Sequence, residues 1–224
     1  MRAPTPSPAE PDLPDELTPA ELRELGHDER LNELELRDMD LHDQSARGVS
    51  ISACRLASAD LSGSRLEHLS LVDSVVQTCN LANVRGRSAQ LRKVLVLGSR
   101  VTGIDLGSAT LRDVTFRDCR IDLASFSTAR LQRVSFEDCI LAQTDFLDAQ
   151  LDSVRFVRCE LTNADVRGAR VKDSELRRSD LTGLQGVDSL RGIAMEWTDI
   201  LDGAGVWASA LGIEVLDPDA PARG

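Results

Sequence analysis

Residues 111–130, LRDVTFRDCRIDLASFSTAR, and residues 131–150, LQRVSFEDCILAQTDFLDAQ, decide the fold of this chain. In both lines a large apolar residue stands at every position whose number ends in 1 or 6, and a smaller residue stands two positions before it. Residues two apart in an extended strand point to the same side. The pattern therefore predicts a narrow core, which each five-residue segment enters with one small and one large side chain.

The pattern continues without a break from Leu31 to Leu181. Of the 31 positions in the large series, 29 are Leu, Ile, Val or Phe, and the exceptions are Ala46 and Gly86. All five Phe belong to the large series, and all five Cys belong to the small one. Because Gly86 has no side chain, we expect a local irregularity of the core at that position.

The positions between the inward pairs indicate corners. Those whose numbers end in 3 or 8 are Gly, Asn or Asp at 16 of 31 places, and these residue types tolerate positive φ. Like residues recur every 20 positions, so one coil has four sides of five residues. The columns that show this are Val94, Val114, Val134 and Val154; Cys119, Cys139 and Cys159; and Phe116, Phe136 and Phe156. The sequence predicts an all-β solenoid of about eight 20-residue coils over residues 31–184.

The flanking segments lack this pattern. Residues 1–17 are rich in Pro and acidic residues, which predicts a disordered tail. Thr18-Pro19-Ala20-Glu21 matches a capping box with Pro at the first helical position, so we expect an N-terminal helical cap over residues 18–30. At the other end we expect a cap with a helix that opens near Thr198 over residues 185–216, then a disordered tail over residues 217–224.

Three stretches carry a family resemblance: Ala59-Asp60-Leu61-Ser62-Gly63, Ala164-Asp165-Val166-Arg167-Gly168 and Ser179-Asp180-Leu181-Thr182-Gly183. They resemble the A(D/N)LxG consensus of pentapeptide-repeat proteins. The resemblance implies a right-handed quadrilateral β-helix. The best-understood branch of that family binds bacterial DNA gyrase by imitating B-form DNA, protects it from fluoroquinolones, and often dimerises through a C-terminal cap.

The charge distribution bears on that branch. The net charge is −11, but residues 31–184 hold 21 Lys and Arg against 22 Asp and Glu. In the 20-residue register one side nets −4, because Arg100 and Arg120 offset part of its acidic set. The acidic residues of that side are Asp40, Asp43, Asp60, Asp122, Glu160 and Asp180. A DNA mimic needs a continuous negative surface, so gyrase or topoisomerase binding is kept as the alternative function. The acidic charge also argues against direct nucleic-acid binding.

Two apolar sets are candidate contacts with proteins. Val75, Leu95 and Leu97 point outward on one side of two adjacent coils, where they form a partner patch or ordinary surface scatter. The second set would anchor a homodimer through the C-terminal cap or be buried inside the cap: Trp197, Ile200, Leu201, Trp207 and Leu211.

We expect no catalytic, metal or cofactor site. The Cys of the small series act as small buried apolar residues, and zinc requires a tetrahedral set rather than a straight file of thiols. None of His27, His42 and His68 stands at readable spacing from a nucleophile and a carboxylate. The chain has no apolar run long enough for a signal peptide or a membrane span, so we expect a cytoplasmic protein. The predicted function is a non-catalytic protein–protein interaction module with an unidentified protein partner.

Overall fold

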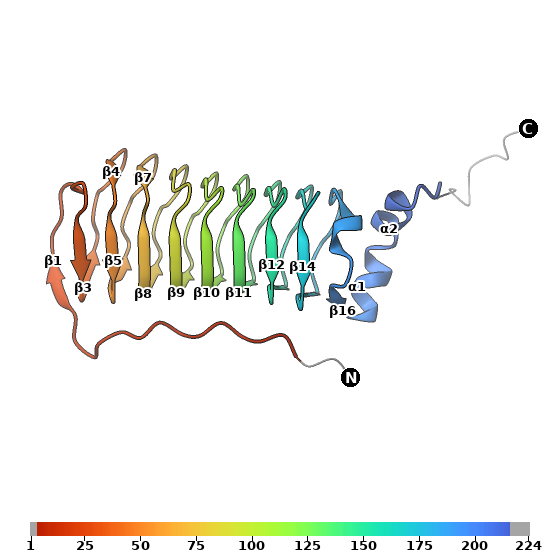
Figure 1. The fold of residues 1–224 in the computed structure, drawn as a ribbon, viewed down its shortest axis with the longest axis horizontal. Helices are drawn as coiled ribbons and strands as arrows, with labels where there is room; N and C mark the ends of the chain where they lie inside the picture. The colour runs from red at the N-terminus through yellow and green to blue at the C-terminus, as the bar shows by residue number, and fades with distance from the viewer. Residues whose placement is uncertain (1–3, 216–224) are drawn as a thin grey trace, which may run out of the picture.

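The protein is a straight rod of stacked coils (Figure 1), in a computed structural model that describes residues 4–215. Neighbouring coils pair in parallel with a register of 20 residues, as Gln90 pairs with Thr110 and Thr110 with Arg130. The stack has about nine turns. The solenoid of 20-residue coils is confirmed, and short strands outside the repeat phase extend it at both ends.

The elements follow in chain order. The strands are β1 (Thr18–Ala20), β2 (Arg30–Asn32), β3 (Leu34–Arg37), β4 (Ser45–Arg47), β5 (Ser50–Ser52), β6 (Arg55–Ala57), β7 (Arg65–Glu67), β8 (Ser70–Gln77), β9 (Gln90–Leu97), β10 (Thr110–Arg117), β11 (Arg130–Glu137), β12 (Gln150–Asp152), β13 (Arg155–Val157), β14 (Arg170–Lys172), β15 (Glu175–Arg177) and β16 (Ala194–Met195). The helices are the 3-10 helix η1 (Val187–Leu190), α1 (Trp197–Asp202) and α2 (Ala204–Ala210).

Each coil has four sides, which we number by their stacked outward residues. The first side carries Gln90, Thr110 and Arg130; the second Leu95, Thr115 and Ser135; the third Asn80, Arg100 and Arg120; the fourth Arg85, Asp105 and Ser125. Strands β8 to β11 run over the first and second sides without interruption. The corner between these two sides carries Asp73, Lys93, Asp113, Arg133 and Ser153, and we call it the strand corner.

The corners have the predicted backbone conformation. Every residue whose number ends in 3 or 8, from Asp28 to Gly183, has a positive φ. Many are not Gly, Asn or Asp; Lys93 has φ 51° and Leu123 has φ 59°. The left-handed conformation costs such a residue about 1–2 kcal/mol. The hydrogen bonds between coils offset this cost, since the N–H of Leu123 donates to the carbonyl oxygen of Ala142 at 3.0 Å.

The core is densest where the Phe residues stack. Phe116, Phe136 and Phe156 form one column with ring centroids 5.2 Å apart, and Phe126 and Phe146 form a second with the same spacing. The two columns meet edge to face, as Phe126 does with Phe136 at 5.9 Å. All five rings are buried. Both ring arrangements are favourable for aromatic pairs, so this region should stabilise the whole rod.

The irregularity expected at Gly86 is present. An apolar cavity of about 70 Å³ lies in the coils around this residue, and Leu66, Leu106 and Phe116 are among the side chains that line it. Leu66 and Leu106 are the neighbours of Gly86 in the same inward column. The missing side chain has therefore left a void rather than a collapsed coil.

Replacing Gly86 with alanine is expected to raise the free energy of unfolding by about 1 kcal/mol. The backbone of Gly86 is not left-handed, and the atom nearest to an added Cβ would be the movable Cδ2 of Leu106, at 3.3 Å, with Ala89 and Asp105 at ordinary contact distance of 3.9 Å. Urea unfolding followed by circular dichroism would measure the change. Gly103→Ala is the matched control and should destabilise, because Gly103 has φ +67° and an added Cβ would lie 2.5 Å from Oδ1 of Asn83. A loss of stability in Gly86→Ala would contradict the prediction.

The predicted N-terminal helix over residues 18–30 is wrong. Thr18–Ala20 form strand β1, which pairs in parallel with β3, and the N–H of Thr18 donates to the carbonyl oxygen of Glu33 at 3.0 Å. Alternate residues of a parallel strand direct their N–H groups to opposite edges, so Pro19 takes a position that needs no donor toward β3. Covering the open edge of the first coil has outweighed the local capping signal.

The tail prediction for residues 1–17 also needs correction over residues 4–17. These residues form neither helix nor strand, but they follow an extended path along the coils toward the other end of the rod (Figure 1). Three hydrogen bonds join them to side chains of the rod. The Pro-rich composition had indicated disorder. The stacked coils instead form a surface along which the segment lies.

The C-terminal cap contains helices, as predicted, but their arrangement differs. Strand β16 pairs with β15 and adds a last layer to the sheet. Helix α1 begins after Glu196, which forms a capping box with Asp199, and Gly203 separates α1 from α2. The sequence had predicted one helix from Thr198 onward. The expected tail over residues 217–224 lies outside the described residues.

Candidate interaction surfaces

The predicted acidic residues do lie together on the third side. Asp40, Asp60, Glu160 and Asp180 belong to one bridged column. That column is interrupted by Asn80, Arg100, Arg120 and Ile140. The predicted set divides accordingly: Asp40, Asp43 and Asp60 precede the interruption, Asp122 lies within it, and Glu160 and Asp180 follow it.

Local hydrogen bonds stabilise the charged form of Asp60 and Asp180. Those from Ser62 lower the pKa of Asp60, and those from Thr182 lower the pKa of Asp180. Asp122 accepts hydrogen bonds from the hydroxyl of Thr102 at 2.8 Å and from Nε of Arg120 at 3.0 Å. The third side is thus acidic at both ends and mixed in its middle.

The predicted partner patch lies on the second side. Val75 and Leu95 are stacked partners in the sheet, and Leu97 stacks on Gln77. All three patch residues are half-buried rather than fully exposed. The N-terminal segment passes close to the patch, since the N–H of Asp12 donates to Oδ1 of Asp73 at 3.3 Å, two residues before Val75.

Exposed apolar side chains gather on the C-terminal cap. Of the eight large apolar residues with more than a third of their surface exposed in residues 4–215, six lie in this cap. They are Trp197, Ile200, Leu201, Leu211, Ile213 and Val215. Trp197 is 71% exposed and Leu211 is 76% exposed, whereas Trp207 is half-buried and packs against the core. Each of the two predicted alternatives therefore applies to one tryptophan: Trp207 packs inside the cap and Trp197 faces solvent.

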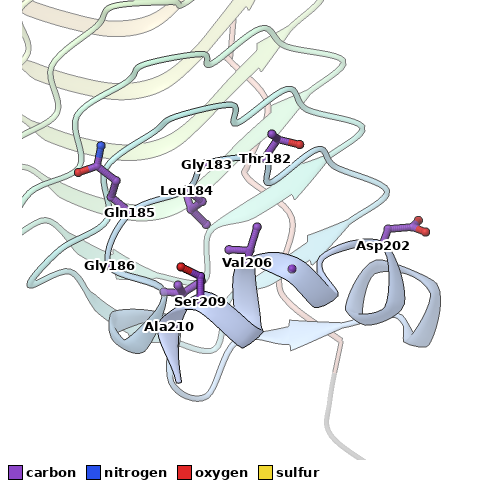
Figure 2. A pocket seen from close by; sticks show the side chains of 11 residues that line it. Thr182, Gly183, Leu184, Gln185, Gly186, Asp202, Val206, Ser209 and Ala210 are labelled. Atoms are coloured by element: carbon purple, nitrogen blue, oxygen red, sulfur yellow. The ribbon is translucent and has the colours of Figure 1, made fainter. Parts of the chain in front are cut away.

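A groove separates the last coil from helix α2 (Figure 2). It has a volume of about 620 Å³, and its polar side chains are Thr182, Gln185, Asp202 and Ser209. Asp202 is the single ionisable residue among those that line it in the described chain.

The cysteines occupy the core, as the small series predicts. All five are buried and free. Burial raises the pKa of Cys159 to about 11, and the hydrogen bond with the thiol of Cys119, followed by burial, raises the pKa of Cys139. The same hydrogen bond lowers the pKa of Cys119. Thiols with a raised pKa stay protonated at neutral pH and are poor nucleophiles and metal ligands. Within residues 4–215 no three His, Cys, Asp or Glu side chains are grouped to hold a metal ion. In the same range, no helix has the length and apolar character needed to cross a bilayer.

Sequence reasoning missed the residues that hold the N-terminal segment. Asp73, Asp113 and Arg155 lie on or beside the strand corner and bond to Asp12, Ala9 and Ser7. A signal for this arrangement is present in the tail, where Pro8, Pro11 and Pro14 recur every three residues. That spacing is the period of the polyproline II helix.

Comparison with known proteins agrees with the coil geometry. A family model described as a pentapeptide repeat region matches residues 70–139 and 119–185. HetL, a pentapeptide repeat protein involved in heterocyst differentiation regulation from the cyanobacterium Nostoc sp. strain PCC 7120, is 20% identical, with a TM-score of 0.43 over 75% of this chain and 90% of HetL. Trypsin-treated QnrB1, a plasmid-mediated fluoroquinolone resistance protein, is 18% identical, with a TM-score of 0.43 over 90% of this chain and 99% of QnrB1. No curated protein matches the sequence significantly.

Proposed function

This chain belongs to the pentapeptide-repeat family, whose members are generally non-catalytic, and we propose that it is a protein-binding module. The C-terminal cap pairs two copies of the chain, and the second side of the rod binds another protein. The observation that carries the proposal is the gathering of six exposed large apolar side chains on one end of the rod. Soluble monomers rarely expose so much contiguous apolar surface unless it meets a partner.

The composition of the cap supports the pairing of two copies. Trp197 is an exposed aromatic residue one helical turn from Leu201 on α1, and Leu211 is exposed at the end of α2. Aromatic residues contribute much of the binding energy at interfaces. A two-fold dimer uses the same patch on both chains, so one apolar cluster is sufficient. Sedimentation velocity of the full chain over a wide concentration range tests the proposal. A dimer that forms reversibly supports it, and a monomer at all concentrations would remove its basis.

The second side supports a further partner. It carries Val75, Leu95 and Leu97 in adjacent coils of the longest strands, where the backbone is most regular. The rod interior is filled with side chains, so binding uses a side rather than a deep pocket. Leu95→Asp and Leu97→Asp together test this surface, because they leave the inward residues untouched. Unchanged oligomeric state and unchanged partner capture by this variant would rule out the patch.

The acidic third side supports one alternative, a DNA mimic that binds gyrase and protects it against fluoroquinolones. Stacked carboxylates at Asp40, Asp60, Glu160 and Asp180 favour it, and the interruption at Arg100 opposes it. A continuous negative stripe is what an imitation of the DNA backbone requires.

We expect the purified protein to leave gyrase supercoiling and its sensitivity to a fluoroquinolone unchanged, because the stripe is broken in its middle. A supercoiling assay with and without the drug measures this effect. The control variant is Arg100→Glu with Arg120→Glu, which replaces both cations of the column with carboxylates. Inhibition or drug protection by the wild-type protein would promote the DNA mimic to the main function.

A further inference from the structure

The N-terminal segment has a regular relation to the surface beneath it. In residues 4–20, nearly all the half-buried residues recur every three positions, and the residues between them are exposed. The residues in this three-fold series are Thr5, Pro8, Pro11, Pro14, Leu17 and Ala20, and Leu13 is the one half-buried residue outside it. A polyproline II helix has three residues per turn and presents one residue per turn to a flat surface. Thr5, Pro8, Pro11 and Pro14 therefore face the rod along one edge of such a helix, before the chain bends at Asp15 and Glu16 and enters β1.

Backbone hydrogen bonds repeat with the same period. The N–H of Ala9 donates to Oδ1 of Asp113 at 3.2 Å, and the N–H of Asp12 donates to Oδ1 of Asp73 at 3.3 Å. Three residues separate the donors, and two coils separate the acceptors. Three residues of polyproline II rise about 9.3 Å, and two coils at about 4.8 Å each span about 9.6 Å. The two spacings match, so Asp113 and Asp73, two coils apart, can accept from N–H groups that are three residues apart.

The acceptor carboxylates are held in place by the rod. Asp113 is 7% exposed, and Arg133 donates to its two oxygens at 2.6 and 2.7 Å. Asp73 lies 3.3 Å from Nζ of Lys93. The next contact along the segment comes from Arg155, which donates to the hydroxyl of Ser7 at 3.0 Å. Preorganised acceptors lose little freedom on binding, which favours a specific site over loose adhesion.

The surface under the segment is the most covered of the four sides. The outward residues of the second side are half-buried or buried from Val75 to Glu175, whereas those of the first side are exposed from Gln90 to Arg170. The segment from Pro4 to Leu17 carries four acidic residues and no basic one. Along the strand corner Lys93 and Arg133 are paired with Asp73 and Asp113, so hydrogen bonds rather than net charge hold the segment there.

From this match we infer that the strand corner and the second side form a docking track for extended proline-rich segments in the polyproline II conformation. Residues 4–17 occupy the track in cis, and the partner is a segment of another protein with Pro at every third position that takes their place. This inference deepens the proposed binding role, because it assigns the patch on the second side a class of partner and a built-in competitor.

A competition experiment on the full chain tests the inference. The probe is a fluorescent peptide with the sequence of residues 4–17, and its anisotropy is measured as protein is added. In the test protein, Pro8→Gly, Pro11→Gly and Pro14→Gly together loosen the cis segment without changing the coils. We expect the peptide to bind this protein at least about tenfold more tightly than wild type, because a tethered segment competes at a high effective concentration.

Two controls distinguish specific docking on the track from nonspecific binding of the peptide. A peptide of the same composition with its prolines moved off the three-residue spacing should bind at least about tenfold more weakly, since its apolar edge no longer faces one side. Asp113→Ala in the loosened protein should also weaken binding. Asp138→Ala is its matched control and should leave binding unchanged, because Asp138 is paired with Arg158 at 2.6 Å on a corner that the segment does not touch.

Each outcome decides the question. The docking track would be ruled out if the peptide did not bind the loosened protein. It would also be ruled out if binding were the same after the prolines are moved and after Asp113→Ala. Equal binding to wild type would overturn the cis occupancy, and so would amide hydrogen exchange at Ala9 and Asp12 as fast as in the free peptide. The dimer through the cap is measured separately in the same variants, so a failure of the track leaves that part of the proposed function standing.

Discussion

Replacing Phe136 with alanine is expected to lower the free energy of unfolding by about 3–5 kcal/mol, because it removes a fully buried ring from a rigid stack. Phe136 is the ring with contacts on all sides: it stacks on Phe116 and Phe156 at 5.2 Å and meets Phe126 and Phe146 edge to face. Coils joined by continuous hydrogen-bond ladders cannot close in on the space that the ring leaves. Most of the lost contact area should therefore remain as a cavity.

Urea unfolding followed by circular dichroism measures this loss. Phe136→Leu is the control and should cost far less, since it keeps most of the volume. Phe156→Ala should fall between the two, because Phe156 stacks on one ring and meets one other edge to face. A solenoid can lose its coils in stages, so hydrogen exchange of the coils around Phe136 should be measured in parallel. Equal losses for Phe136→Ala and Phe136→Leu would show that the column tolerates a void.

Replacing Trp197 and Leu211 together with aspartate is expected to make the protein monomeric. Each residue presents more than two thirds of its surface to solvent, so neither supports the fold of the cap. In a two-fold interface both chains would lose two anchors, each worth about 2 kcal/mol or more, and would gain facing negative charges. We expect dimer dissociation to become at least about a thousandfold easier.

Sedimentation velocity of wild type and variant at matched concentrations checks this prediction. Leu123→Asp is the control, because Leu123 is 56% exposed but lies on the rod away from the cap. It also puts an aspartate in place of an apolar residue that is more than half exposed, and it should leave the dimer intact. If the Trp197 and Leu211 variant stayed dimeric, the interface would lie outside the exposed face of the cap. If the Leu123→Asp control became monomeric, the dimer would form through the side of the rod.

The sequence by itself determined the rod. An unbroken five-residue period places each residue inward, outward or at a corner, and recurrence every 20 residues sets the size of the coil. Both signals are local, because each coil is a near copy of the next and pairs with its neighbours in one register. The core, the positive φ at the corners and the void at Gly86 follow from that regularity.

The tertiary structure alone decided the ends and the surfaces. Thr18–Ala20 became a strand instead of a helix because an open ladder edge, formed far along the chain, offers hydrogen bonds that a capping box cannot match. Trp197 and Trp207 look alike in sequence, and only the packing of α2 on the last coil buries one and exposes the other. The N-terminal segment lies along the rod because Asp73 and Asp113, 40 residues apart in sequence, come two coils apart in space, where they match one polyproline II turn. Contacts of this kind depend on distances between remote residues, which a local pattern does not contain.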